Sequence, residues 1–143
     1  MGREGWKAGD LVDRLRRHAS TDDHVHWMHE ASDAELSVLY GHAFVVVVAS
    51  FAEGFGLPVA EALGHGVAVI ASSGGALPEA GGGAAEYFDP YDSTELATLL
   101  ERHLEDESHH SERVRVARSN EPRRWAVAAA EVGAVLGSVP LRS

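Results

Sequence analysis

Two uninterrupted apolar segments stand out in the hydrophobic pattern of this chain. Residues 43–49 read AFVVVVA and residues 67–71 read VAVIA, with no polar residue at alternate positions. Continuous apolar strands of this kind are typical of parallel sheets that are covered on both faces. Residues 85–88 and the weaker segment 24–28 are two further strand candidates. The pattern therefore predicts a buried parallel sheet.

Helical spacing of apolar residues predicts helices between and after these strands. Asp10 is the expected N-cap of the first helix and Ser93 that of a later one, since both side chains can accept a backbone N–H. The predicted helices cover residues 10–19, 33–43, 57–63, 93–106, 108–121 and 123–137, with one short helical turn at 77–80. The tail at 138–143 is expected to be disordered.

The alternation of strands and helices predicts an α/β fold. We expect a Rossmann-like parallel sheet with helices on both faces, in a single domain spanning residues 1–143. The chain opens with a helix, whereas a doubly wound sheet begins with a strand. The pattern thus also predicts a domain that lacks its first strands, with an exposed strand edge that favours pairing with another chain.

Charge and composition narrow the possible partners. The formal net charge is −10, which argues against nucleic acid and anionic membranes as partners. The sequence has no cysteine, no apolar run near the ~20 residues that span a bilayer, and no visible targeting signal, so we expect a cytoplasmic location. Between Arg17 and Arg102 there is no lysine or arginine. A phosphate bound in that segment must be held by backbone N–H groups, by histidine or by cations from elsewhere.

The most informative stretch is SFAEGFGLPVAEAL, residues 50–63, which follows the valine-rich strand. Gly54 and Gly56 allow the backbone to approach a ligand closely, and a helix beginning near Leu57 would point free N–H groups at an anion. Glu53 and Glu61 stand on either side of this turn, and carboxylates accept hydrogen bonds from vicinal hydroxyls. A diphosphate between two hydroxyl-bearing rings fits this pattern, so the sequence predicts a nucleotide-sugar site.

These residues also carry a family resemblance. EGFGLPVAE resembles the glutamate–seven–glutamate signature of retaining GT-B glycosyltransferases, the group 1 enzymes of glycosyltransferase family 4 in particular. Further matches, in the family's order, are GREGW, VHWMHEASDAEL, HGVAVIASSGGALPE, EYFDPYD and Trp125. The chain differs from the family at His29, where the family usually has glycine, and at Ala68, where it usually has proline.

The resemblance implies a C-terminal donor-binding domain and a role for each site residue. Glu53 would be the catalytic residue that hydrogen-bonds the transferred sugar, and Glu61 would bind the ribose. Backbone groups of Gly54, Phe55, Gly56 and Leu57 would lie near the sugar and diphosphate, and the backbone near Ala31 would meet the nucleobase. Transfer would proceed with retention and without a metal or other cofactor. The family's cationic clamp and its acceptor-binding N-terminal domain would come from sequence outside this chain, so the chain alone is expected to be weakly active or inactive.

Three alternatives stay open. Among nine histidines, His24, His26 and His29 invite a metal site, but His29 falls outside strand spacing and no carboxylate has a clear ligand role, so we expect no metal. The glycine-rich segment 72–84 lacks a Walker lysine, and a plain loop beside the donor pocket is favoured. Finally, the chain could be a non-catalytic relic or partner-binding module, including a homo-oligomer that pairs through the exposed strand edge.

Overall fold

The computed structural model describes residues 9–21, 24–28, 30–120 and 134. Contacts divide the chain into two compact units, Met1–Leu39 and Tyr40–Ser143. The expectation of one domain over residues 1–143 stays a prediction. The predicted helix at 123–137 and the predicted disorder at 138–143 fall outside the described residues, apart from residue 134.

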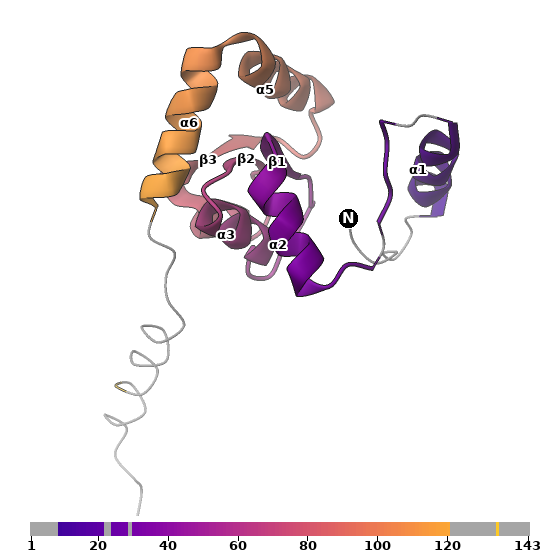
Figure 1. The fold of residues 1–143 in the computed structure, drawn as a ribbon, viewed down its shortest axis with the longest axis horizontal. Coiled ribbons are helices and arrows are strands. Elements are labelled where there is room, and N and C mark those ends of the chain that lie inside the picture. Colours follow the sequence, from indigo (N-terminus) through magenta and orange to yellow (C-terminus); the bar gives the residue numbers. More distant parts are fainter. Residues whose placement is uncertain (1–8, 22–23, 29, 121–133, 135–143) are drawn as a thin grey trace, which may run out of the picture. The chain divides into compact units, whose positions relative to one another are not determined.

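The elements follow one another in the expected alternation (Figure 1). In order they are α1 (Gly9–Thr21), α2 (Asp33–His42), β1 (Val45–Val48), α3 (Leu57–Gly64), β2 (Ala68–Ser72), α4 (Leu77–Gly81), the 3-10 turn η1 (Gly82–Ala84), β3 (Ala85–Phe88), α5 (Ser93–Glu105) and α6 (Glu107–Ser119). None of the helices within the described residues is long and apolar enough to span a bilayer.

The sheet is parallel, in the order β1-β2-β3. The central strand β2 is buried at all five positions, so both of its faces are covered. One face places Val69 and Ala71 in the main core together with side chains of α3, α4 and α6. On the other face Ile70 lies in register with Glu86 of β3, and Glu86 contacts His103 of α5. The expected α/β fold with helices on both faces is therefore confirmed.

The chain enters α3 and α5 by two different caps. Gly56 is the N-cap of α3 in a left-handed conformation, and Pro58 lies in the first turn, where the absent N–H costs no helical hydrogen bond. Asp92 is the N-cap of α5, and its carboxylate accepts from the backbone N–H groups of Thr94 at 2.8 Å and Glu95 at 3.3 Å. The start of α3 at Leu57 matches the prediction, and the cap of α5 corrects the expectation of Ser93.

Three predictions about individual elements are wrong. Residues 24–28 form no strand, because among the described residues no neighbouring strand pairs with them. Ser93 is the first residue of α5 and not its cap. The carboxylate of Asp92 takes that role, because it accepts from the first free N–H groups of the helix. α1 begins at Gly9, one residue before the expected cap at Asp10. The other predicted boundaries in the described chain agree to within about two residues.

Candidate functional site

The candidate site is the loop from Ala49 to Gly56, which leaves the carboxyl end of β1 and enters α3. Gly56 closes it with φ 74° and ψ 30°. A Cβ on Gly56 would lie 2.5 Å from the Cβ of Ala80. Glycine is thus required here twice, once by the left-handed backbone and once by the closeness of α4.

A second loop fixes the shape of the first. A Cβ on Gly75 would lie 2.6 Å from both the backbone nitrogen and the backbone oxygen of Glu53, so the two backbones touch. A Cβ on Gly74 would lie 2.9 Å from the carbonyl carbon of Phe51. The N–H of Ala76 donates to the carbonyl of Glu53 at 3.0 Å. The position of Glu53 is therefore set by the loop that follows β2.

Ser72 ties the two loops together from inside the sheet. Its side chain is fully buried, its hydroxyl donates to the carbonyl of Ser50, and the N–H of Gly74 donates to its oxygen at 3.4 Å. Ser72 ends β2 next to the carboxyl end of β1. One buried hydroxyl thus joins both loops at the edge of the sheet where α/β folds bind ligands.

Glu61 lies on the exposed side of α3. The opposite side carries the buried residues Val59, Ala62 and Leu63. Leu57 and Glu61 are four residues apart, so they share a helix face, with Glu61 about 6 Å along the axis from the start of the helix. Both are exposed. The carboxylate of Glu61 therefore projects from the same face that begins at the helix N-terminus.

Tyr40 orients the Glu61 side chain. The tyrosine hydroxyl donates to Glu61 Oε2 at 3.3 Å, and the tyrosine ring lies 5.4 Å from the ring of His65. Burial raises the pKa of Tyr40, and the negative charge of Glu61 raises it further. Tyr40 therefore stays protonated near neutral pH and acts as a donor to the carboxylate.

Four of the predicted site residues belong to one loop, whereas Ala31 belongs to the other compact unit. Glu53, Gly54, Phe55 and Gly56 are consecutive in the loop, and Glu53 is half-buried whereas Phe55 is 61% exposed. Ala31 belongs to the other compact unit, so the expected contact between its backbone and a nucleobase stays a prediction. The individual ligand roles of all these residues stay predictions as well.

Tyr40 and Ser72 are the two site-supporting side chains that the sequence did not reveal. Tyr40 looked like one more apolar position on a helix, and Ser72 like part of a loop. Only the contact of Tyr40 with Glu61 and the pairing of β2 with β1 show what their hydroxyls contact. The double glycine of SSGG was the one available signal, since adjacent glycines indicate close backbone approach.

The loop offers backbone N–H groups and carboxylates for chemistry. The helix dipole of α3 and the N–H of Leu57, which has no acceptor within its own helix, favour an anion at the turn. Arg113, by contrast, donates to the carbonyls of Gly83 and Ala84 before β3, at the amino edge of the sheet and so away from this loop. The arrangement can hold a phosphate by dipoles and a hydroxylated ring by carboxylates.

Sequence comparison relates the chain to known proteins. Residues 5–121 match the family described as Glycosyl transferases group 1. The chain is 34% identical over 107 residues to O-antigen chain mannosyltransferase B of Escherichia coli, covering 75% of this chain and 28% of that protein. It is 37% identical over 97 residues to the MMP alpha-(1->4)-mannosyltransferase of Mycolicibacterium hassiacum, covering 66% of this chain and 24% of that protein.

Solved structures agree with the fold. The sucrose-phosphate synthase of Thermosynechococcus elongatus superposes with a TM-score of 0.66 at 28% identity, over 90% of this chain and 33% of that one. Anabaena HepE, solved in complex with UDP, gives a TM-score of 0.77 at 21% identity, over 96% of this chain and 40% of the other. The fold is therefore that of part of a GT-B enzyme, and the chain spans about a quarter of the curated relatives named above. With most of its length matched, this chain belongs to the group 1 glycosyltransferase family.

Proposed function

We propose that this chain is the donor-binding part of a retaining glycosyltransferase of family 4, which transfers a sugar from a nucleotide-diphosphate sugar to an acceptor. Both curated relatives described above are named mannosyltransferases, so mannose is the first donor sugar to test. HepE, solved with UDP, makes uridine the first base to test.

In this proposal the two carboxylates bind different parts of the nucleotide-sugar donor. Glu53 accepts hydrogen bonds from the transferred sugar and is the catalytic residue. Glu61 binds the ribose hydroxyls, held in place by Tyr40. The backbone of Gly54, Phe55, Gly56 and Leu57 surrounds the diphosphate, and the nucleobase meets the backbone near Ala31.

One observation carries the proposal: a tightly packed turn holds the backbone of Glu53 before a helix N-terminus, and the carboxylate of Glu61 lies one turn into that helix. Gly56 opens α3 in the left-handed conformation that the turn needs. The carbonyl of Glu53 is held by Ala76, so the loop needs little reorganisation when a ligand binds. Fixed dipoles at the place where charge develops on a leaving diphosphate lower the barrier to its departure, with no metal at this site.

The rest of the enzyme would supply what this stretch lacks. The segment from residue 18 to residue 101 has no lysine or arginine, so a diphosphate cation must come from other sequence or another chain. An acceptor-binding N-terminal domain would close over the donor. We therefore propose that this chain binds nucleotide but transfers little or no sugar by itself.

Calorimetric titration of the full chain with UDP, GDP and ADP tests the donor site. Hydrogen bonds to a charged group contribute about 1.5–3 kcal/mol, so Glu61→Ala should weaken binding of the preferred nucleotide by roughly 10- to 100-fold. Glu101→Ala on exposed α5 is the matched control and should leave affinity unchanged. A folded protein that binds none of the three nucleotides would refute the proposal.

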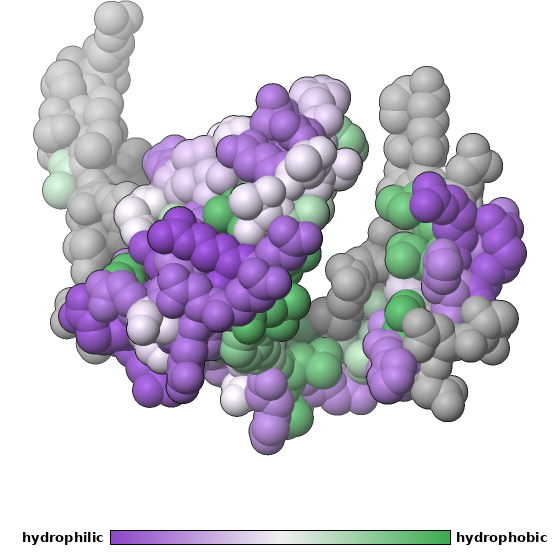
Figure 2. Space-filling model, turned by 90° about the horizontal axis from the view of Figure 1, so that it is seen from above, coloured by the Kyte–Doolittle hydropathy of each residue, from purple (hydrophilic) through white to green (hydrophobic). Residues whose placement is uncertain are grey.

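A second candidate function is a partner-binding module. Among the described residues β1 pairs with β2 on one side only. Near that free edge Phe44 is 49% and Val47 39% exposed, and exposed apolar side chains interrupt an otherwise hydrophilic surface (Figure 2). An unpaired apolar strand edge favours strand addition by another domain or by a second copy. Self-association in light scattering together with no nucleotide binding would favour this function over the first.

A further inference from the structure

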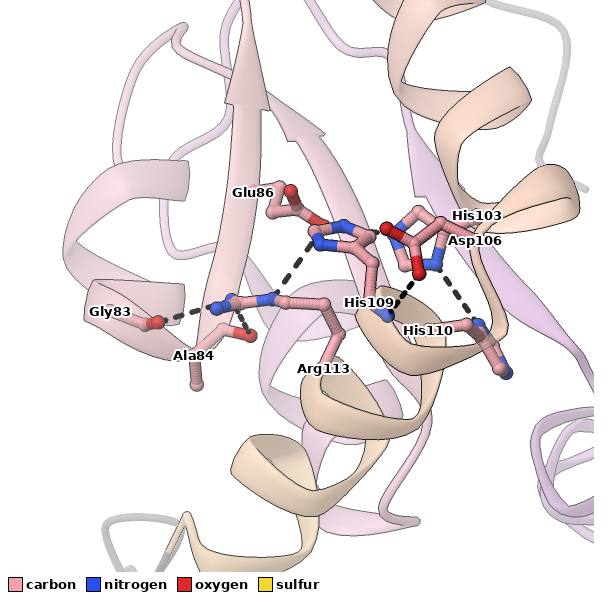
Figure 3. A network of polar contacts seen from close by, with 8 residues as sticks. All are labelled: Gly83, Ala84, Glu86, His103, Asp106, His109, His110 and Arg113. Atoms are coloured by element: carbon pink, nitrogen blue, oxygen red, sulfur yellow. Dashed lines mark hydrogen bonds and ion pairs between the residues drawn. The ribbon is translucent and has the colours of Figure 1, made fainter.

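A compact polar cluster lies at the amino half of β3, apart from the candidate donor loop. It brings together Glu86 of β3, His103 of α5 and His109 of α6 (Figure 3). Glu86 Oε2 lies 2.8 Å from His103 Nε2 and 3.1 Å from His109 Nε2. One oxygen and two ring nitrogens, each from a different element, thus converge on one point.

The cluster is set into the protein interior. The His103 side chain is fully buried, and the side chains of His109 and Glu86 are only 11% and 15% exposed. Burying an ionisable carboxylate and two imidazoles is costly unless they are paired or bind an ion. None of their buried side-chain nitrogens or oxygens is left without a partner in the described part of the chain.

His110 fixes the orientation of the buried ring. The Nδ1 atoms of His103 and His110 are 3.0 Å apart, so one of them donates to the other. The His110 ring stacks on Phe44 with 3.8 Å between ring centroids. If His103 Nδ1 is the donor, its Nε2 is a free lone pair directed at Glu86. Ligand histidines are commonly held in this way by a second group on the far ring nitrogen.

Two of the distances are a few tenths of an ångström shorter than those between the ligands of a four-coordinate zinc ion. With zinc–ligand bonds of about 2.0–2.2 Å, neighbouring ligand atoms of a tetrahedron lie about 3.3–3.5 Å apart. Two of the three edges here are 2.8 and 3.1 Å, and all three ligand atoms lie within 4.8 Å of one another. If each histidine Nε2 moved a few tenths of an ångström away from Glu86 Oε2, these two distances would fit a zinc ion, with water as the fourth ligand.

We propose that Glu86, His103 and His109 bind a divalent transition-metal ion, and that zinc fits the site. Two imidazoles and one carboxylate are an established zinc donor set. Both rings bind as neutral imidazoles after a change of tautomer. The proton of His103 moves from Nε2 to Nδ1, and the resulting Nδ1–H donates a hydrogen bond to Nδ1 of His110. The ion joins β3, α5 and α6, so its role is to hold α5 and α6 on the sheet. This departs from the absence of a metal that we expected from the sequence.

The positive charge of Arg113 disfavours a cation at Glu86, and this gives a further test of the proposal. Its Nε lies 3.6 Å from Glu86 Oε2, and its guanidinium also donates to the carbonyl of Ala84 at 2.8 Å. A bound cation has to share the carboxylate with this positive charge. Arg113→Gln should therefore tighten metal binding, whereas loss of a merely structural contact would not.

Zinc titration of the metal-free full chain against a chromophoric chelator tests the proposal. One zinc ion should bind, and a Co²⁺ adduct should show the intense visible absorption of a four-coordinate ion. Because loss of an outer-shell partner costs about 10- to 100-fold in metal affinity, His110→Ala should fall in that range. Glu86→Gln and His109→Ala should lose more affinity, and zinc should raise the Tm of the unchanged chain but not that of these two variants.

His65→Ala is the control, since it removes an exposed histidine of the same unit outside the cluster. Circular dichroism checks that each variant is folded. If Glu86→Gln does not fold, His109→Ala still tests the proposal. The proposal is overturned by absence of zinc binding in the unchanged chain. It is also overturned by affinities that are equal in the His109 and His65 variants, or by weaker binding in Arg113→Gln.

Discussion

The turn at Gly56 allows a graded test of how the donor loop is built. The perturbation is a set of three glycine-to-alanine substitutions at positions that differ in backbone angles and in free space. Gly56 has φ 74°, and a methyl group added there would lie 2.5 Å from the Cβ of Ala80. Gly82 has φ 49° and open space within 4 Å, whereas Gly54 has open space and no positive φ.

The expected magnitudes follow from those differences. A left-handed alanine costs about 1–2 kcal/mol, and overpacking a methyl group costs about 1–3 kcal/mol more. Alanine also restricts the unfolded chain, which offsets about 0.4–1 kcal/mol of these costs. Gly56→Ala should therefore lower the free energy of unfolding by about 1–4 kcal/mol. Gly82, with ψ −135°, lies outside the left-handed helical region, so Gly82→Ala should lower it by about 0–2.5 kcal/mol. Gly54→Ala should be neutral or stabilising.

Urea denaturation followed by far-ultraviolet circular dichroism measures the three free energies of unfolding. The order is more informative than any single value, because the offset from the unfolded chain is common to all three. A loss below about 1 kcal/mol in the Gly56 variant would show that the contact with Ala80 costs little. A Gly54 variant as unstable as Gly56→Ala would refute the conformational reasoning altogether.

Three further outcomes are expected. Ser72→Ala leaves the carbonyl of Ser50 and the N–H of Gly74 without their partner, so it should lower the free energy of unfolding by about 1–3 kcal/mol in urea denaturation. A change below about 0.5 kcal/mol would count against the role of Ser72 in joining the two loops. Asp92→Ala removes the cap of α5 and should cost about 0.5–2 kcal/mol, whereas Ser93→Ala should cost far less, with the reverse order contradicting the cap assignment. Hydrogen bonds from Ser32 lower the pKa of Glu35, so this contribution to stability is complete above the unfolded value of about 4.3 and is lost as pH falls through the folded pKa. In an NMR titration Ser32→Ala should raise the Glu35 midpoint, and an unchanged midpoint would contradict the assigned cause.

Local chemistry explains why much of the fold was readable from the sequence. The unbroken valines of β1 and the apolar run of β2 predict buried strands, and the glycine-proline spacing before Val59 marks the start of α3. β2 is buried at every position as predicted, whereas β1 is buried only at Val48. The segment at 24–28 carries a similar local signal and forms no strand, because pairing is a property of two segments and not of one. The resemblance to glycosyltransferases rested on such short, contiguous motifs, and the family is confirmed.

The polar cluster escaped sequence reasoning for the same physical reason. Glu86 and His109 are 23 positions apart, and each by itself is an ordinary residue of a strand or helix. The histidines that lie close in sequence, His24 and His26, drew attention, whereas the convergent ones are brought together only by the packing of α5 and α6 against β3. Groups that depend on tertiary contacts leave no periodic trace.

The close crossing of Gly74 and Gly75 over residues 51–53 has a consequence for engineering. Because the two backbones touch, neither segment can change length or shape without the other. Exchanging the Glu53 loop with that of a relative in order to alter sugar preference would place foreign backbone against an unaltered glycine pair. Both segments, together with Ser72 beneath them, have to be transplanted as one cassette.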